Sequence, residues 1–188
     1  MHNAFMPVLH CSVEDAVIVV VDIQSTFMEV IHERERVLRR SRYLAQVAQV
    51  LDIPVLATEQ NPTRLGELED SLLPFVSRPI SKMSFSCWGS AEFREGIEGS
   101  GRSSIVLVGV ETHICVALTA LDLVNAGYNV FVCPDATSSR TVEMHKLGME
   151  RMRDSGVLPS HTDTLVYEWL GSAEHPKFKE VLKLVKEA

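Results

Sequence analysis

One cysteine of this chain stands where a thiol could act as a nucleophile. Cys115 follows the apolar run 105–108 and Gly109, and it precedes the segment 116–126, which has the composition of a helix. The first turn of a helix carries unpaired N–H groups and the positive end of the helix dipole, so a thiol there tends toward the nucleophilic thiolate. A small buried residue at a strand–helix junction is the simpler explanation. The case for a nucleophile therefore depends on partners elsewhere in the chain.

Two charged residues at other expected strand ends are candidates for those partners. Asp22 directly follows the β-branched run 16–21, and Lys82 ends the stretch 79–82. Parallel sheets bind ligands outside the carboxyl ends of their strands, so Asp22, Lys82 and Cys115 are expected to meet at one edge. The carboxylate could then take the thiol proton, and the ammonium would stabilise the resulting negative charge. Alone, Asp22 could be a cap and Lys82 a surface lysine; together they favour a site.

The elements that would position these residues alternate between strand and helix. Strands are expected at 16–21, 55–58, 79–82, 105–108, 129–133 and 157–158. Helices are expected at 37–51, 68–75, 116–126 and 141–154, with one ending at Leu170 that Ser160 or Thr162 could cap and a terminal one around 178–185. This alternation predicts an α/β fold, a three-layer α/β/α arrangement with a mostly parallel, Rossmann-like sheet of about six strands. No repeat or linker divides the chain, so residues 1–188 are predicted to form a single domain.

The totals limit the class of partner. The chain has 188 residues, 46% of them hydrophobic, which is enough for one good core. A net charge of −7 disfavours non-specific binding to nucleic acid or to an anionic membrane. The cysteines at 11, 87, 115 and 133 have no zinc-site spacing, and neither a signal peptide nor a membrane-length apolar run is visible. An intracellular protein with reduced thiols is expected, with the cytoplasm the first choice and an organelle still open.

The residues around these positions resemble the isochorismatase-like cysteine hydrolases, the superfamily that includes nicotinamidase and N-carbamoylsarcosine amidohydrolase. The matching pieces are 21–24 with Phe27, then Lys82, then 109–116, and 135–140 is similar to the segment after the fifth strand of the family. The resemblance implies that Cys115 forms an acyl-enzyme, with Asp22 as the base and Lys82 as the stabilising charge. It also implies a homo-oligomer, since members of the superfamily are often oligomeric.

The same resemblance implies how an oxyanion would be held. Members of the family carry a cis peptide bond at the place that matches Val110–Glu111. The backbone N–H groups of Glu111 and Cys115 would form the oxyanion hole, where two aimed donors stabilise the developing charge. His113 is a weaker candidate for a base, because residues two apart in a turn rarely face each other.

Residues of the substrate pocket are expected in the loops after the first two strands. Gln24 and Phe27 follow Asp22, and Gln60 follows the second strand, so these three are the candidates for binding a small-molecule substrate. Trp88 is an alternative aromatic wall, although either aromatic side chain could simply belong to the core.

The segment 58–66 departs from the nicotinamidase pattern. Nicotinamidases bind a divalent metal there through an Asp-x-His pair, whereas this segment offers Glu59 and no histidine. No metal or other cofactor is therefore expected, and nicotinamide hydrolysis is disfavoured. Its Thr-Glu-Gln and Leu-Gly pattern is similar to the YcaC-like and isochorismatase domain-containing branch. Isochorismatase itself lacks the cysteine, so Cys115 argues against cleavage of a vinyl ether.

Two classes of function remain. The first is a metal-independent cysteine hydrolase acting on a small amide or a related C–N bond. The second is a catalytically silent scaffold or binding protein. Some proteins of this branch carry a ribonuclease label, but an acidic chain without a paired-carboxylate metal site gives phosphodiester cleavage no support.

Overall fold

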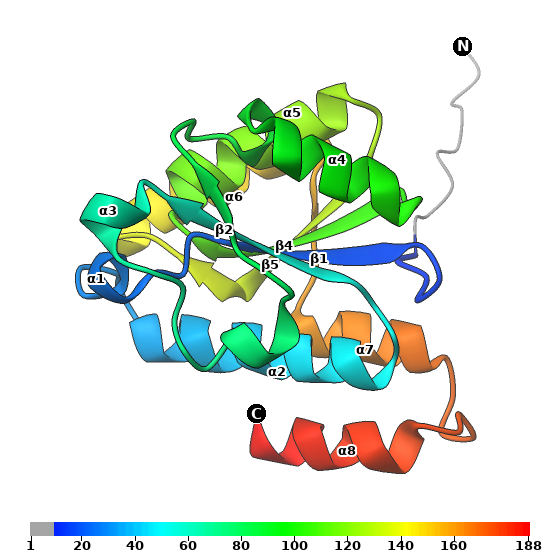
Figure 1. Cartoon of the computed structure of the whole chain (residues 1–188). Coiled ribbons are helices and arrows are strands. Elements are labelled where there is room, and N and C mark those ends of the chain that lie inside the picture. The colour runs from blue at the N-terminus through cyan, green and yellow to red at the C-terminus, as the bar shows by residue number, and fades with distance from the viewer. Residues whose placement is uncertain (1–9) are drawn as a thin grey trace.

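A parallel sheet of six strands forms the centre of the molecule (Figure 1). A computed structural model describes residues 10–188. The strands are β1 (Ala16–Val21), β2 (Val55–Gln60), β3 (Ile80–Lys82), β4 (Ser104–Val110), β5 (Asn129–Ser138) and β6 (Leu158–Pro159). Their order in the sheet is β3-β2-β1-β4-β5-β6, and every neighbouring pair is parallel. The expected α/β class with about six mostly parallel strands is confirmed.

Helices cover both faces of this sheet. They are α1 (Ser25–Met28), α2 (Arg34–Val50), α3 (Pro62–Leu65), α4 (Ala91–Ser100), α5 (Ala117–Asn125), α6 (Val142–Asp154), α7 (Thr162–Leu170) and α8 (Phe178–Glu187). In Figure 1, α4, α5 and α6 lie on one face, and α2 and α7 lie on the other, with α8 packed beneath α2. Within residues 10–188, no helix combines the length and the apolar character needed to cross a membrane.

The central strand β1 shows why the sheet needs both layers. All six of its residues are completely buried. Ile18 and Val20 belong to the core on the α2 side, whereas Val17 and Val19 belong to the core on the α5 side. Successive side chains of a strand point to opposite faces, so an uninterrupted β-branched run can bury itself only between two layers.

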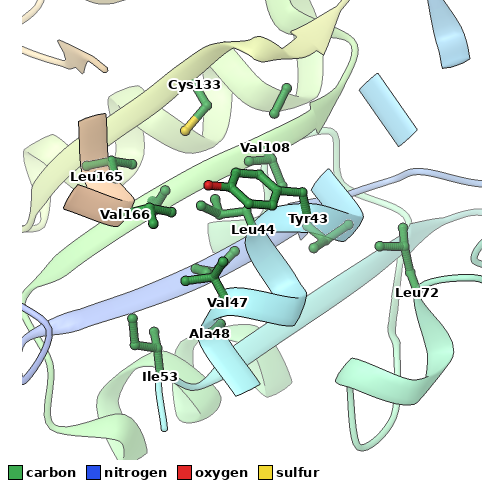
Figure 2. Close-up of a cluster of buried hydrophobic side chains, with 14 of the residues drawn as sticks. Tyr43, Leu44, Val47, Ala48, Ile53, Leu72, Val108, Cys133, Leu165 and Val166 are labelled. Carbon is green, nitrogen blue, oxygen red and sulfur yellow. The ribbon is translucent and has the colours of Figure 1, made fainter. Parts of the chain in front are cut away.

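The core on the α2 side is built around the apolar stripe of that helix. Figure 2 shows Tyr43, Leu44 and Val47 from α2 packed with Leu165 and Val166 from α7 over the sheet. These α2 residues fall at helical spacing, which aligns them on one face of the helix. The expected helix at 37–51 is therefore correct in register and begins three residues earlier, at Arg34.

Two expectations about local structure were wrong, and one helix was not predicted. The segment expected to be a helix at 68–75 contains only the 3₁₀ turn Leu73–Phe75, because the N–H of Leu68 donates to the Glu59 carboxylate at 2.8 Å. The cap of α7 is His161, whose ring accepts from the N–H of Asp163. Helix α4 was not predicted, since glycines at 96 and 99 weaken its helical pattern.

Candidate active site

The carboxyl ends of the central strands bring the expected residues together. Strand β1 lies between β2 and β4, so the order of the strands reverses there, and such a point commonly binds ligands. Asp22 follows β1 and Lys82 ends β3. The Lys82 Nζ lies 2.8 Å from Asp22 Oδ2, and both side chains are fully buried. A buried ion pair of this kind persists only when its remaining polar atoms are also bonded.

The Asp22 carboxylate has a partner on each oxygen. Its Oδ1 accepts a hydrogen bond from the Thr58 hydroxyl at 2.8 Å, while Oδ2 faces Lys82. The backbone N–H of Asp22 also donates to the Thr58 carbonyl at 3.2 Å. Asp22 itself has a φ of +50°, a left-handed conformation that turns the chain out of β1. Strand β2 therefore holds this residue through both backbone and side chain.

Lys82 is surrounded by acceptors. Its ammonium donates to Gln60 Oε1 at 3.0 Å and to the carbonyls of Ser84 and Phe85, both at 3.2 Å. Burial alone would lower the pKa of Lys82. Its interactions with Cys87, Asp22 and Cys115 outweigh burial and hold this pKa above the usual value. The side chain is consequently a permanent positive charge beneath the site.

Cys115 lies in a π-helical turn, Thr112–Val116, that precedes α5. The expected helix at 116–126 is therefore present, but the sulfur precedes its regular part. Burial raises the pKa of the Cys115 thiol far above its ordinary value, the charge and hydrogen bond of Asp22 raise it further, and Lys82 opposes them. Desolvation therefore opposes the tendency toward thiolate that the helix end favours. The resting group is a neutral thiol beside a carboxylate.

Two glycines allow the backbone to approach closely around this turn. Gly109 has a φ of +113°, and a Cβ there would lie 2.1 Å from the Val21 carbonyl oxygen. A Cβ on Gly148 of α6 would lie 2.8 Å from the Cα of His113. Any larger residue would push β4 away from β1, or α6 away from the turn that carries Cys115.

Glu111 connects the end of β4 to this turn. Its peptide bond with Val110 is cis. Its carbonyl oxygen accepts from the N–H groups of Ile114 and Val116, which flank Cys115 in the chain. Its buried carboxylate accepts from the backbone N–H of Arg140 at 3.0 Å and from the guanidinium Nε at 3.1 Å.

A cavity of about 480 Å³ opens above Cys115. Its walls are mostly apolar, with a few polar side chains and the ion pair of Arg140 and Glu111 among them. The apolar side chains are Phe27, Val30, Leu65, Phe85 and Ile114, and the polar ones besides Cys115 are Thr26, Gln60, Glu111 and Arg140. Such a concave, mostly apolar site with a few polar groups suits a small molecule.

The expected substrate residues divide into two kinds. Phe27 and Gln60 line the cavity. Gln24 is completely buried, and its amide donates to the Gln60 carbonyl at 3.0 Å and accepts from the Gln60 N–H at 2.7 Å. Gln24 therefore ties the loop after β1 to β2 and does not line the cavity. Trp88 instead packs edge-on against Phe93 and Tyr128.

Other walls of the cavity were not expected from the sequence. Phe85, Ile114 and Arg140 line it; the segments 109–116 and 135–140, which carry the family resemblance, contain Ile114 and Arg140, whereas Phe85 lies in neither. The ring of His113 bonds the Ser139 hydroxyl at 2.9 Å, so this ring has a partner other than the thiol. Across residues 10–188, no group of three or more His, Cys, Asp or Glu side chains is placed to hold a metal ion.

Known proteins resemble this chain over most of its length. The isochorismatase domain family matches residues 16–164. Isochorismatase domain-containing protein 2A of Mus musculus is 35% identical over 177 residues, which cover 93% of this chain and 84% of that protein. Isochorismatase domain-containing protein 2 of Bos taurus is 37% identical over 166 residues, which cover 88% and 80%.

Solved structures share the fold. The MAR1 ribonuclease of Caenorhabditis elegans superposes with a TM-score of 0.89 at 30% identity, over 95% of this chain and 93% of that one. YcaC of Escherichia coli, described as an octameric hydrolase of unknown specificity, gives a TM-score of 0.86 at 20% identity, over 97% and 98%. The domain match and the relatives above 30% identity show that this chain belongs to the isochorismatase family and has the hydrolase fold of that family.

Proposed function

We propose that this chain is a cysteine hydrolase that cleaves a small amide or a related C–N bond. Cys115 is the nucleophile, Asp22 is the base, and Lys82 holds the charge that makes proton transfer possible. The observation that carries this proposal is the buried pair of Lys82 and Asp22 at 2.8 Å, whose charges act on the thiol of Cys115, a residue that lines the cavity.

The first half-reaction forms a thioester. As Sγ of Cys115 attacks the carbonyl carbon, the thiol proton passes to Asp22 and the carbonyl electrons move to oxygen. The backbone N–H groups of Glu111 and Cys115 donate to that oxyanion. When the adduct collapses, the C–N bond breaks, and Asp22 returns its proton to the leaving nitrogen.

The second half-reaction restores the enzyme. A water molecule attacks the thioester carbonyl while Asp22 takes one of its protons. The C–S bond then breaks, the proton returns to sulfur, and a carboxylic acid leaves. Because the pKa of the Cys115 thiol is raised by burial and by Asp22, the thiol stays protonated until a substrate arrives. The positive charge of Lys82 lowers the cost of this proton transfer, because it stabilises the negative charge that develops on the sulfur while Asp22 holds the proton.

The substrate is a compact molecule with an apolar part. Phe27 and Gln60 contact it, and Gln24 acts from behind by holding Gln60 in place. The proposal includes assembly as a homo-oligomer, in line with the octameric description of the Escherichia coli neighbour. It also includes an intracellular location, supported by four free cysteines, although a relative in Phytophthora sojae is described as a secreted effector.

Ribonuclease activity is a second candidate, favoured by the name of the Caenorhabditis elegans structure. The charge of the cavity walls disfavours a polyanionic substrate. Arg140 is the single basic residue among them, and its guanidinium already donates to the Glu111 carboxylate. A catalytically silent scaffold is the remaining alternative.

A substrate screen distinguishes these functions. Amides, carbamoyl compounds, nitriles and a labelled RNA are incubated with the wild type, with Cys115→Ala, and with Cys133→Ala as the matched control at a cysteine outside the cavity. We expect turnover of at least one C–N compound that Cys115→Ala abolishes and Cys133→Ala retains. RNA cleavage that survives Cys115→Ala, or turnover indifferent to Cys115, would contradict the proposal.

A further inference from the structure

We infer that Thr58 is a positioning residue for Asp22, and that the buried thiol of Cys87 fixes the Thr58 hydroxyl in turn. The inference rests on the proposed function, because it explains how the base is oriented. Thr58 lies in β2, opposite Val21 in the register with β1, and it is completely buried. It does not line the cavity, so any effect on the reaction passes through Asp22.

Counting protons gives the direction of the contacts. A threonine hydroxyl has one hydrogen, and an ionised carboxylate can only accept. The hydrogen of Thr58 therefore goes to Asp22 Oδ1, 2.8 Å away. The Cys87 Sγ lies 3.6 Å from the same Thr58 oxygen, and with that hydrogen already used, the thiol must be the donor. The resulting chain runs from Cys87 S–H to Thr58 O–H to the carboxylate.

Cys87 is suited to be the first donor. It is completely buried, and its backbone N–H donates to the Thr119 hydroxyl at 2.9 Å, which anchors it against α5. Burial, together with the charge of Asp22, raises the pKa of the Cys87 thiol to about 11, so the S–H is intact at neutral pH. The thiol is thus a fixed donor that reaches the base through Thr58, and like Thr58 it does not line the cavity.

The consequence is a carboxylate that cannot rotate. Oδ1 is bonded to Thr58 and Oδ2 to Lys82, so the plane of the carboxylate is set from two sides. The lone pairs that remain are those available to the Cys115 thiol, whose pKa is raised by burial and by the charge of Asp22. Without Thr58, the carboxylate would accept from Lys82 alone and would present several orientations to Cys115.

The rate at which iodoacetamide alkylates Cys115 measures how well Asp22 accepts the thiol proton, and this measurement needs no substrate. Sulfur forms a bond to the methylene carbon, iodide leaves, and the thiol proton passes to Asp22. The alkylation rate of Cys115 in each variant is measured by mass spectrometry across a pH series. The hydrolysis of any substrate found in the screen is measured on the same variants. Thr58→Val removes the donor at almost constant volume, Thr58→Ser keeps it, and Cys87→Ala removes the donor behind it.

We expect Thr58→Val to slow alkylation by about tenfold or more, because a hydrogen bond to a charged group is lost. The acidic limb of the rate profile should move to higher pH, since the carboxylate form loses a donor. Thr58→Ser should stay within about threefold of the wild type, and Cys87→Ala should fall between the two. In hydrolysis, kcat should fall while KM stays unchanged. In an Asp22→Asn background, Thr58→Val should add no further slowing.

Two results would overturn the inference, and they have different meanings. If Thr58→Val and Cys87→Ala both match the wild type in rate and pH profile while Asp22→Asn is slow, the positioning role fails and the proposed function stands. If Asp22→Asn also alkylates at the wild-type rate, the proposed base fails as well. If Thr58→Val does not fold, the alkylation rates of Cys87→Ala and Thr58→Ser are compared with the wild type instead. Equal rates and pH profiles for Cys87→Ala and the wild type would then overturn the proposed chain of donors.

Discussion

The ammonium of Lys82 lies 2.8 Å from a carboxylate oxygen of Asp22, and neither side chain is exposed to solvent. Lys82 ends β3 and Asp22 directly follows β1, and β2 lies between these two strands in the sheet. The pair therefore exists only in the folded protein, and its charges are neutralised by each other and by hydrogen bonds. This relationship connects the stability of the molecule to the chemistry proposed for it.

Removing one charge of this pair should be costly. Lys82→Met leaves the Asp22 carboxylate buried and unpaired, which typically lowers the free energy of unfolding by about 3–5 kcal/mol. Urea denaturation at neutral pH measures the loss. The double variant Asp22→Asn/Lys82→Met should be more stable than Lys82→Met alone, because no charge is then left without a partner. A Lys82→Met protein as stable as the wild type would show that the pair is not buried in solution.

Stability should fall as the pH rises into the alkaline range. Burial raises the pKa of the thiol of Cys11 to about 11 and that of Cys87 to about 11, and it also raises that of Cys133. Above the ordinary value of 9.0, the unfolded thiol has lost a proton that the folded one keeps. Each such thiol then lowers the free energy of unfolding by up to about 1.4 kcal/mol per pH unit.

Urea denaturation at several pH values from neutral to alkaline checks this slope. Cys133→Ala should reduce the slope, whatever its effect at neutral pH, because it removes one of the titrating thiols. An unfolding free energy that is constant or rises between pH 9 and 10 would contradict the assignment of neutral buried thiols.

Close packing at Gly148 should matter for the turn that carries Cys115. An alanine there would place its Cβ 2.8 Å from the Cα of His113, so the turn that carries Cys115 must move. We expect Gly148→Ala to lose about 1–3 kcal/mol of stability and most of the hydrolytic activity. Gly99→Ala in α4 is the matched control, since its Cβ would meet nothing within 4 Å. Thermal unfolding and turnover of the two variants, measured together, test the difference.

Substitutions of Phe27 and Gln24 should have different effects, the first on substrate binding and the second on stability. Phe27 lines the cavity, so Phe27→Ala should raise KM with little change in the free energy of unfolding. Gln24 is buried and bonded to the backbone of Gln60 on both of its amide atoms. Gln24→Leu should instead lower stability by about 1–3 kcal/mol, because backbone groups lose their partners. The reverse pattern of kinetics and denaturation would contradict the placement of both residues.

The parts of the fold that could be predicted are those where a residue pattern is compatible with a single structure. The run of six β-branched and small residues in β1 can be buried only inside a two-sided sheet, and β1 begins and ends where expected. Alternation of strands and helices then gave the sheet type and the edge on which Asp22 and Lys82 meet. Helix α4 was missed because Gly96 and Gly99 reduce its helical propensity, although Ser90 and Gly101, which cap it, are residue types typical of helix ends.

The parts of the site that could not be predicted depend on burial. The sequence indicates that Cys115 stands near a helix end, but desolvation, which raises its pKa, depends on neighbours from other strands. Gln24 and Phe27 are three residues apart in one loop, and only the folded chain shows that one supports β2 and the other lines the cavity. Phe85 and Ile114 reach the cavity through tertiary packing that no local pattern encodes.

The measurement that tests the central claim most directly is the trapping of an acyl-enzyme. The protein is mixed with p-nitrophenyl acetate, quenched at short times, and weighed as an intact chain before peptide mapping. The account predicts a single acetyl group on Cys115, absent in Cys115→Ala, slow to form in Asp22→Asn, and unaffected in Cys133→Ala. Acetylation spread over several residues, or formed at equal rates with and without the Asp22 carboxylate, would contradict it.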